Sequence, residues 1–217
     1  MGFIIGVDEV GRGCLAGEVV VAAVCVPCDT IPVTGVRDSK KLTAKKREAL
    51  AKAIQEAKSP IYSVIRRNSV AEIDRVGINQ ATKECFLSSI HELFYLPGIE
   101  ISEIVVDGNP LWDLDLFPVK TQFIPKADDT VWAVGAASIL AKVYRDAMMV
   151  ELAKEYPYYL WEKNKGYGTS AHIQALEKYG ATPEHRKKFT DSALRNARAK
   201  KRPVTPEADC WADFLNF

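Results

Sequence analysis

The chain has 217 residues, 47% of them hydrophobic and 26% charged, and its formal net charge is +1 at pH 7. This length suits one domain with a substantial core, or one domain with a small appendage. The nearly balanced charge lacks the global basic excess of strong polyanion binders, although basic residues gather in 37–47, 163–165, 186–188 and 195–202. The composition therefore allows a local basic stripe beside an acidic pocket.

The cysteines and the apolar segments indicate in which cellular compartment the protein is expected. Five cysteines with irregular spacing predict no disulfide framework and favour a reducing cytoplasm. The C-x-x-C of Cys25 and Cys28 has no second pair for zinc and no helix pattern after it, so we interpret it as structural. No charged start precedes a long apolar segment, so we expect neither a signal peptide nor a membrane span. One self-sufficient domain makes a monomer the default expectation.

The first predicted element is a buried strand that begins at Phe3 and ends at the glycines of Gly11-Arg12-Gly13. It delivers two adjacent carboxylates, Asp8 and Glu9, to the rim of a sheet, where active sites are usually built. Neighbouring strand residues point to opposite faces, so these side chains converge only if the ladder ends or bulges between them. We interpret this stretch as the centre of an active site.

Two other interpretations of this stretch stay open. Asp8 and Glu9 can simply be a solvated strand terminus. Residues 11–16 also match G-x-G-x-x-A, a dinucleotide-binding fingerprint. That fingerprint needs a helix next, whereas residues 17–26 predict a second strand, so the dinucleotide interpretation is disfavoured.

A basic connection follows the second strand. It carries Lys40 and Lys41, and Thr43 is the predicted N-cap of a helix running to about residue 58. Cations at the start of a helix oppose its dipole, which favours a visiting anion; a solvated basic turn is the alternative. The pattern then predicts a strand over 60–66, a short helix from Ser69 or Val70, and a longer helix over 78–96.

A second acid-tipped strand is predicted over 101–107. Its continuous apolar run indicates a strand covered on both faces, and Asp107 repeats the arrangement of Asp8. Taken alone, such an acid is more often a turn or cap residue. A further strand is predicted over 120–125, and residues 127–130 are expected to cap the next helix.

That helix is predicted over 131–156, with small apolar residues at its start that suit tight packing against a sheet. Asp146 shares a helical face with Ser138, Ile139 and Lys142, so this acid lies on a stripe that approaches the core. An acid in such a place needs a partner, either Lys142 or a metal ion.

The last third of the chain is polar. Residues 163–170 place Tyr167 among glycines, cations and hydroxyls, a combination that suits phosphate and sugar contacts with a ring for stacking. The alternative is an ordinary loop before a helix capped by Thr169 or Ser170. Asp191 is predicted to cap a final helix through residue 199, and the tail to residue 217 is expected to dock onto the body.

Four separated acids together indicate metal chemistry. They are Asp8, Glu9, Asp107 and Asp146, which come from two strand ends and one helix. Like carboxylates cannot all ionise in one place without compensation, and oxygen-only ligation favours Mg²⁺ or Mn²⁺ over zinc. A pair of such ions is the usual device for in-line displacement at a phosphodiester.

Several blocks of the sequence occur in a fixed order. The blocks are Gly6 to Gly13, Asp38 to Leu42, Val106 to Gly108, Ala137 to Val143 with Arg145 and Asp146, and Lys165 to Thr169. In this order they resemble ribonuclease HII, the type 2 ribonuclease H family, and the similarity runs to about Phe189. Cys14, Glu18, Lys188 and Thr190 depart from the family pattern, which affects packing and duplex grip but leaves the four acids in place.

The resemblance implies an α/β, ribonuclease H-like fold. A mixed β-sheet flanked by helices would form a catalytic core in residues 1–160, and a C-terminal helical extension in 161–217 would clasp the substrate and carry the tail. The resemblance also implies metal-dependent cleavage of RNA paired with DNA, and nicking 5′ of single ribonucleotides embedded in duplex DNA, which leaves 5′-phosphate and 3′-hydroxyl ends. Asp8, Glu9, Asp107 and Asp146 match its catalytic, metal-binding acids.

Substrate contacts are implied as well. Residues 11–13 match the loop that senses the 2′-hydroxyl, where missing side chains let the backbone come close. Tyr167 matches a tyrosine that stacks on the sugar of the following nucleotide, so the enzyme is expected to recognise an RNA-to-DNA junction. Lys40 and Lys41 would hold phosphates.

Two alternatives come from other functional classes. A protein that binds hybrid duplexes without chemistry is compatible with the basic clusters and Tyr167, and metal-stimulated turnover would separate it from a nuclease. A nucleotide-cofactor oxidoreductase is compatible with the pattern of residues 11–16, and failure to bind any nicotinamide cofactor would remove it.

Overall fold

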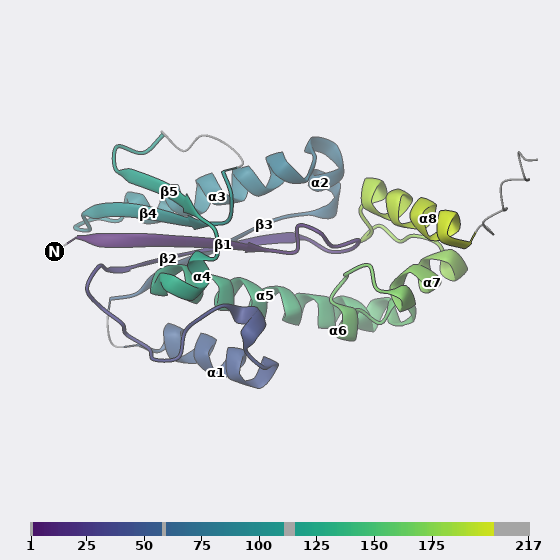
Figure 1. The fold of residues 1–217 in the computed structure, drawn as a ribbon, viewed down its shortest axis with the longest axis horizontal. Helices are drawn as coiled ribbons and strands as arrows, with labels where there is room; N and C mark the ends of the chain where they lie inside the picture. Colours follow the sequence, from purple (N-terminus) through teal and green to yellow (C-terminus); the bar gives the residue numbers. More distant parts are fainter. Residues whose placement is uncertain (1, 58–59, 111–115, 202–217) are drawn as a thin grey trace, which may run out of the picture.

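Five strands form one mixed sheet in the order β3-β2-β1-β4-β5, with helices on both faces (Figure 1). The computed structural model describes residues 2–57, 60–110 and 116–201. The strands are β1 (Phe3–Val10), β2 (Val19–Pro27), β3 (Tyr62–Asn68), β4 (Ile101–Asp107) and β5 (Lys120–Ile124). The helices are η1 (Ser39–Lys41), α1 (Ala44–Gln55), α2 (Val70–Val76), α3 (Ile78–Phe94), α4 (Ala127–Thr130), α5 (Trp132–Glu155), η2 (Pro157–Tyr159), α6 (Trp161–Asn164), α7 (Ser170–Tyr179) and α8 (Lys187–Lys201). The predicted α/β fold with a mixed sheet is confirmed.

The direction of the strands decides where their ends meet. β2 pairs antiparallel with β1 and β3, whereas β1, β4 and β5 run parallel to one another. In this parallel half Val7 lies opposite Val106, where the pairing of β1 with β4 ends. The residues that follow them, Asp8 and Asp107, therefore lie side by side just beyond it. The carboxyl ends of all three parallel strands therefore lie at one edge of the sheet.

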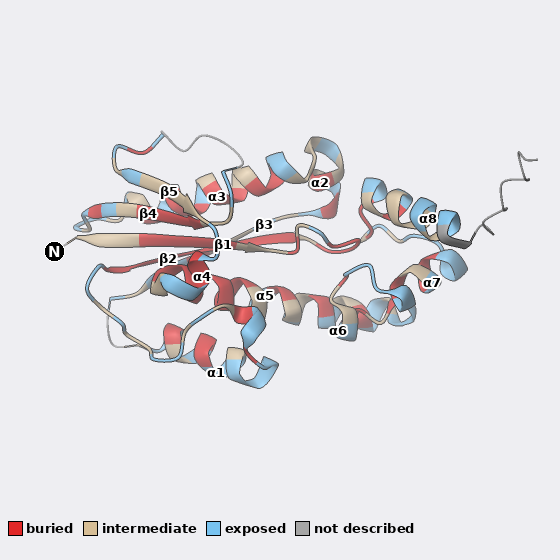
Figure 2. Cartoon of the chain, in the orientation of Figure 1, coloured by how far each residue is buried: buried red, intermediate tan, exposed pale blue. Residues whose placement is uncertain are grey.

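Alternation along β1 assigns each side chain to a face. Ile5 and Val7 are fully buried in a cluster with Phe86 and Ile90 of α3. The β2 residues between Val19 and Pro27 are all buried, because α3 covers one face of the sheet and α5 with α1 covers the other (Figures 1 and 2). Each large apolar side chain buried in this way contributes roughly 1.5–3 kcal/mol to folding, which explains why the strand sequences are so uniformly apolar.

The start of α5 lies unusually close to β1. A Cβ added at Gly6 would lie 2.3 Å from the backbone nitrogen of Val134, so only glycine permits this approach. Small residues on the helix side, including Ala133 and Ala137, complete the contact. The predicted tight packing of this helix against the sheet is confirmed, and it brings Ser138 next to the end of β1.

The predicted caps Thr43 and Thr169 agree with the structure, and two other cap predictions are wrong. Residues 127–130 form the short helix α4, and α5 begins after Val131, which makes no side-chain cap bond. Thr43, Ser69 and Thr169 each accept a backbone N–H with the side-chain oxygen, as N-caps do. The final helix, α8, begins at Lys187, four residues before the predicted cap Asp191. The reason lies elsewhere in the chain, because the Lys187 N–H donates to the carboxylate of Asp74 in α2, at 3.0 and 3.2 Å.

The C-terminal helices pack on the far end of α5. One buried cluster joins these elements; it contains Leu15, Met149 of α5, Trp161 of α6 and Leu176 of α7. The division at residue 160 stays a prediction. The tail expected to dock onto the body lies outside the described residues.

The four cysteines in the described part of the chain, Cys14, Cys25, Cys28 and Cys85, are free thiols. Across those same residues, no helix combines the length and apolarity needed to cross a membrane.

Candidate active site

Three carboxylates meet at the edge where the parallel strands end. Asp8 and Asp107 arrive there as the neighbours that follow the paired residues Val7 and Val106. A third acid, Asp128, joins them from α4, and ligand oxygens of all three lie within 4.8 Å of one another. Asp8 and Asp128 are only 6% and 5% exposed, so this is an acidic pocket rather than a solvated rim.

Asp128 is directed into the pocket by Asp107. The side chain of Asp107 accepts a hydrogen bond of 2.8 Å from the backbone N–H of Ala127, at the start of α4. Lys126, just before it, has a left-handed backbone with φ of 62°, which turns the chain from β5 into this short helix. The turn brings the next residue, Asp128, toward the carboxylate that fixes the helix start.

Burial, and after it the charges of the neighbouring acids, raises the pKa values of the clustered carboxyls. Burial raises the pKa of Asp8 to about 8, and the charges of Glu9 and Asp107 act in the same direction. Burial also raises the pKa of Asp128 to about 6, with the charges of Asp107 and Asp38 contributing. A divalent cation would relieve this repulsion, and an oxygen-only donor set suits a hard cation. The cluster of Asp8, Asp107 and Asp128 can therefore hold a metal ion.

Glu9 approaches the same acids from the other face of the sheet. β1 pairs with β2 without a register shift, Asp8 opposite Ala22 and Glu9 opposite Val21, so no bulge separates the two acids. Glu9 lines a cavity of about 140 Å³ together with Asp107 and Arg12. Burial raises its pKa, and the charge of Asp107 adds to that shift. Asp8 and Glu9 thus point to opposite faces, and Asp107, at the open edge between them, interacts with both.

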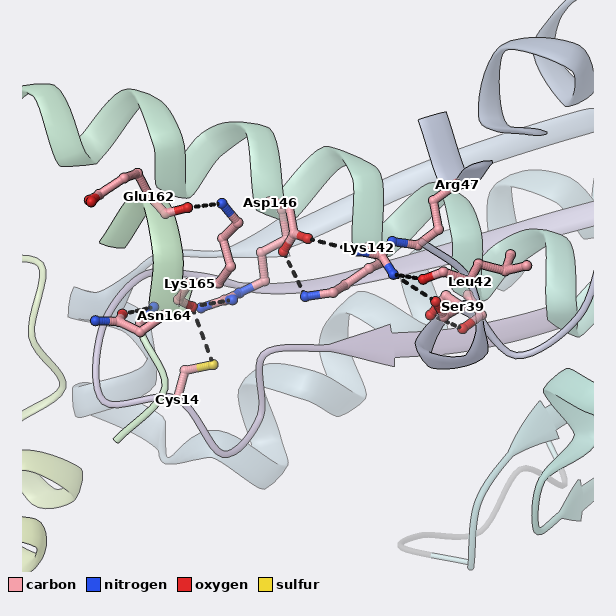
Figure 3. Close-up of polar contacts among 12 residues, drawn as sticks. Cys14, Ser39, Leu42, Arg47, Lys142, Asp146, Glu162, Asn164 and Lys165 are labelled. Atoms are coloured by element: carbon pink, nitrogen blue, oxygen red, sulfur yellow. Dashed lines mark hydrogen bonds and ion pairs between the residues drawn. The ribbon is translucent and has the colours of Figure 1, made fainter. Parts of the chain in front are cut away.

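Asp146 does not join this cluster. Its Oδ1 accepts a hydrogen bond of 2.7 Å from Lys142, and its Oδ2 lies 3.7 Å from a guanidinium nitrogen of Arg47 (Figure 3). Ser138, which donates to Asp8, precedes Asp146 by two turns of α5, a rise of about 12 Å. The ion pair of Asp146 with Lys142 is confirmed, and this geometry gives no support to the expectation that Asp146 is a fourth metal-binding acid, which stays a prediction.

Asp146 instead supports the loop beneath the site. Its partner Arg47 donates to the carbonyl oxygens of Ser39 and Leu42 at 2.9 and 2.6 Å, which fixes η1 against α5 (Figure 3). The Ser39 hydroxyl in turn lies 2.9 Å from the hydroxyl of Ser138. A chain of polar contacts therefore runs from Asp146 to the hydroxyl that touches Asp8.

The two predicted phosphate-binding lysines lie in η1, beside the pocket. Lys40 is exposed, and its charge lowers the pKa of Asp128, which opposes the larger effect of burial. Lys41 forms an ion pair with the carboxylate of Asp129. Lys40 is therefore the freer of the two to meet an anion.

The glycine loop follows directly after the acids. Gly11 has φ of +91°, and a side chain there would collide with Arg145, its Cβ lying 2.2 Å from Nε. Gly13 is exposed, and a Cβ there would meet nothing within 4 Å. Arg12 donates to Asn79 at 2.8 Å and lies 3.5 Å from Glu9, so its side chain stays beside the acids.

Tyr167 presents its ring near the same loop. The ring is 39% exposed, with the Lys142 ammonium 5.8 Å and the Arg145 guanidinium 6.0 Å from its centroid. Cations at this distance are attracted to the face of the aromatic ring, and this cation–π interaction stabilises the position of the ring. An exposed aromatic face between cations is an arrangement that suits a nucleic-acid sugar or base.

The sequence is similar to known proteins over most of its length. The sequence profile of ribonuclease HII matches residues 5–192. The chain belongs to the ribonuclease HII family. As a member of that family it is a ribonuclease H, a metal-dependent hydrolase of phosphodiester bonds.

Individual ribonucleases HII are similar over most of their length. The protein of Wolbachia sp. subsp. Brugia malayi is 49% identical over 203 residues, which cover 91% of this chain and 93% of the relative. That of Thermosynechococcus vestitus is 44% identical over 191 residues, 88% of this chain and 85% of the relative. The crystal structure of ribonuclease H2 from Pyrococcus horikoshii has a TM-score of 0.69 at 25% identity and covers 90% of this chain and 99% of its own.

Asp128 is the residue that sequence reasoning missed. The sequence alone predicts a capping stretch here, because Ala127-Asp128-Asp129-Thr130 precedes a strongly helical segment. A usable signal was present: the stretch follows a strand predicted over 120–125, and a parallel strand ends at the same edge as Asp8 and Asp107. The sequence does not reveal that the strand over 120–125 runs parallel to its neighbour, so an acid in the metal site could not be distinguished from an ordinary helix cap.

Proposed function

We propose that the protein is an endonuclease that cleaves the RNA strand of RNA/DNA hybrids and nicks duplex DNA 5′ of a single embedded ribonucleotide. The products would carry 5′-phosphate and 3′-hydroxyl ends. The observation that carries the proposal is the carboxylate cluster of Asp8, Asp107 and Asp128 within 4.8 Å, in a chain of the ribonuclease HII family. A bare acidic pocket is poorly suited to bind a polyanion, so cations must enter with the substrate.

The metal ions would be Mg²⁺ or Mn²⁺, because every donor is a carboxylate oxygen. Asp8, Asp107 and Asp128 would hold them, with Glu9 reaching Asp107 from the opposite face. Bound in a pair, such ions activate the attacking water and stabilise the leaving oxygen of a phosphodiester. Ser138 supports this arrangement by donating a hydrogen bond to Asp8, which favours the ionised carboxylate that a cation requires.

Recognition of the substrate would come from the surfaces around the pocket. The loop of residues 11–13 would approach the ribose 2′-hydroxyl through its backbone, since Gly13 is exposed and carries no side chain. Tyr167 would stack on the sugar of the next nucleotide, so that the junction from RNA to DNA is recognised. Lys40 and Lys41 would hold phosphates, and the helices from residue 161 onward would clasp the duplex. The monomeric state and the cytoplasmic location stay predictions.

A nicking assay tests the proposal. The substrate is a DNA duplex with one ribonucleotide in a labelled strand, and the matched control is the same duplex without it. With Mg²⁺ or Mn²⁺ the first duplex is expected to be nicked 5′ of the ribonucleotide, and a chelator is expected to abolish the nick. Asp107→Asn should lose the activity, while Asp29→Asn, which changes an exposed acid away from the pocket, should keep it. Intact substrate with both metals would overturn the proposal.

A further inference from the structure

Two arginines are fully buried beneath the glycine loop. Arg145 of α5 and Arg186, just before α8, are both 0% exposed. Among the described residues, neither forms an ion pair with a carboxylate. Burial lowers the pKa of Arg186 to about 10, which still leaves it charged at neutral pH. Burying an unpaired charge is costly, so their hydrogen bonds must compensate.

Arg145 joins the segment after the glycine loop to the loop that carries Tyr167. Its guanidinium donates to the carbonyl oxygens of Glu18 at 3.0 Å, Ala16 at 2.9 Å and Lys165 at 2.8 Å. The Lys165 carbonyl also lies 3.8 Å from the Cys14 thiol, a contact that Figure 3 shows. One planar side chain therefore sets the spacing between two segments that are far apart in sequence.

Arg186 fixes the glycine loop from its other side. Its Nε and Nη2 donate to the Gly17 carbonyl at 2.9 and 2.7 Å, and its Nη1 donates to the carbonyl of Arg12 at 2.9 Å. The peptide that joins Arg12 to Gly13 is trans, so a carbonyl directed at Arg186 turns the Gly13 N–H the opposite way. In the described part of the chain that N–H has no hydrogen-bond acceptor, and Gly13 is exposed.

Direct backbone contacts complete the junction. The N–H groups of Leu15 and Ala16 donate to the Gly166 carbonyl at 2.8 and 3.3 Å. A Cβ at Gly166 would lie 2.5 Å from the Ala16 carbonyl oxygen, so the two segments are as close as their backbones allow. The distance between Gly13 and Tyr167 is thus determined by backbone contacts that the two arginines hold together.

We propose that Arg145 and Arg186 are positioning residues that set the distance and orientation between the glycine loop and Tyr167, and so determine where the enzyme cuts relative to an RNA-to-DNA junction. The inference rests on the proposed function, in which the loop contacts the ribose and Tyr167 the following sugar. Arginine suits the role because its planar fork donates to several carbonyls at fixed angles, whereas lysine is a single point charge. A shift of about 1 Å in such a pair can change rates by about 100-fold.

The test measures cut position rather than rate. The substrate is a DNA duplex with four consecutive ribonucleotides in one labelled strand, and the variants are Arg145→Lys and Arg186→Lys. Arg75→Lys is the matched control, because Arg75 is exposed on α2 and pairs with Glu72. The parent chain and the control are expected to cut mainly 5′ of the last ribonucleotide before DNA. In the two variants the ratio of junction cuts to internal cuts should fall by at least about tenfold.

The outcomes separate the inference from its premise. Slower cleavage with the parental ratio would show that the arginines only stabilise the fold, because loss of folded enzyme lowers the rate without moving the cut. A parent chain without junction preference would overturn the proposed function itself. If neither lysine variant folds, Gly166→Ala provides the same measurement, since its Cβ would lie 2.5 Å from the backbone oxygen of Ala16 and press the two segments apart while both guanidinium groups remain. An unchanged ratio in that variant would overturn the inference.

Discussion

A carboxylate oxygen of Asp128 lies within 4.8 Å of one from Asp8, although the two residues come from α4 and β1, at distant points of the chain. The contact depends on Asp107, which follows Val106 at the end of β4 and binds the first backbone N–H of α4. Asp107 thus brings a third acid into the pocket and is also a member of it.

Removing the Asp128 carboxylate is expected to stop catalysis. Asp128→Asn keeps the size of the side chain and deletes one ligand charge, and a lost cation interaction of several kcal/mol corresponds to at least a 100-fold or so lower rate. The measurement is kcat/KM on the single-ribonucleotide duplex, with Asp29→Asn as the control. Activity within threefold or so of the parent would exclude Asp128 from the metal site.

Asp146→Asn is expected to affect stability more than chemistry. It leaves the ammonium of Lys142 and the guanidinium of Arg47 without their half-buried acid, which should lower the free energy of unfolding by about 1–3 kcal/mol. Urea unfolding measures this loss. Glu56→Gln breaks an exposed pair with Lys52 and should cost less than about 1 kcal/mol. A loss of cleavage as deep as that of Asp107→Asn, with stability unchanged, would return Asp146 to the metal ligands.

Tyr167 is expected to contribute through its ring. Tyr167→Ala should reduce kcat/KM on the single-ribonucleotide duplex by about 5- to 150-fold, the equivalent of about 1–3 kcal/mol of stacking. Tyr167→Phe keeps the ring and should lose far less. Tyr95→Ala, at an exposed ring after α3, serves as the control. Equal losses in the Ala and Phe variants would indicate that the hydroxyl, and not the stacked ring, makes the contact.

The buried histidine pair predicts a loss of stability in acid. Burial lowers the pKa of His185 from 6.5 to about 4, and its Nε2 lies 3.1 Å from that of His172. Between these pH values the unfolded chain binds a proton that the folded chain does not, so the free energy of unfolding falls as pH drops from 6.5 toward 4. The slope is about 1.4 kcal/mol per pH unit for one site.

Urea unfolding across this range, in the parent and in His185→Gln, measures that slope. The variant should show a smaller slope, because the titrating ring is gone. His91→Gln removes an exposed ring on α3 and should leave the parental slope unchanged. A slope in His185→Gln as steep as that of the parent would assign the acid sensitivity to other groups.

The parts of the fold that local sequence determines could be predicted. The apolar runs of β1 and β4 and the caps at Thr43 and Thr169 depend only on neighbouring residues, and all agree with the structure. The start of α8 could not be predicted, because its cap is Asp74 from α2. Asp128 was missed for a similar reason, since its direction is set by Asp107 across the sheet edge.

Asp146 shows the opposite limit of sequence reasoning. Helical spacing identified Lys142 as a possible partner, and that ion pair exists. The second partner, Arg47, comes from α1, whose packing against α5 no spacing rule reveals. The family resemblance places Asp146 in the metal site, although Lys142, one helical turn away in the sequence, also offers it a charge partner.

The most direct test of the carboxylate cluster is a calorimetric titration with Mn²⁺ at pH 7, repeated in buffers of different ionisation enthalpy, on the parent chain, Asp128→Asn and Asp146→Asn. The parent and Asp146→Asn should bind Mn²⁺ and release about one proton, because the pKa of Asp8 is about 8 before a cation enters. Asp128→Asn should bind at least about tenfold more weakly. Equal affinity in all three proteins, or weakened binding in Asp146→Asn alone, would contradict this assignment of the metal site.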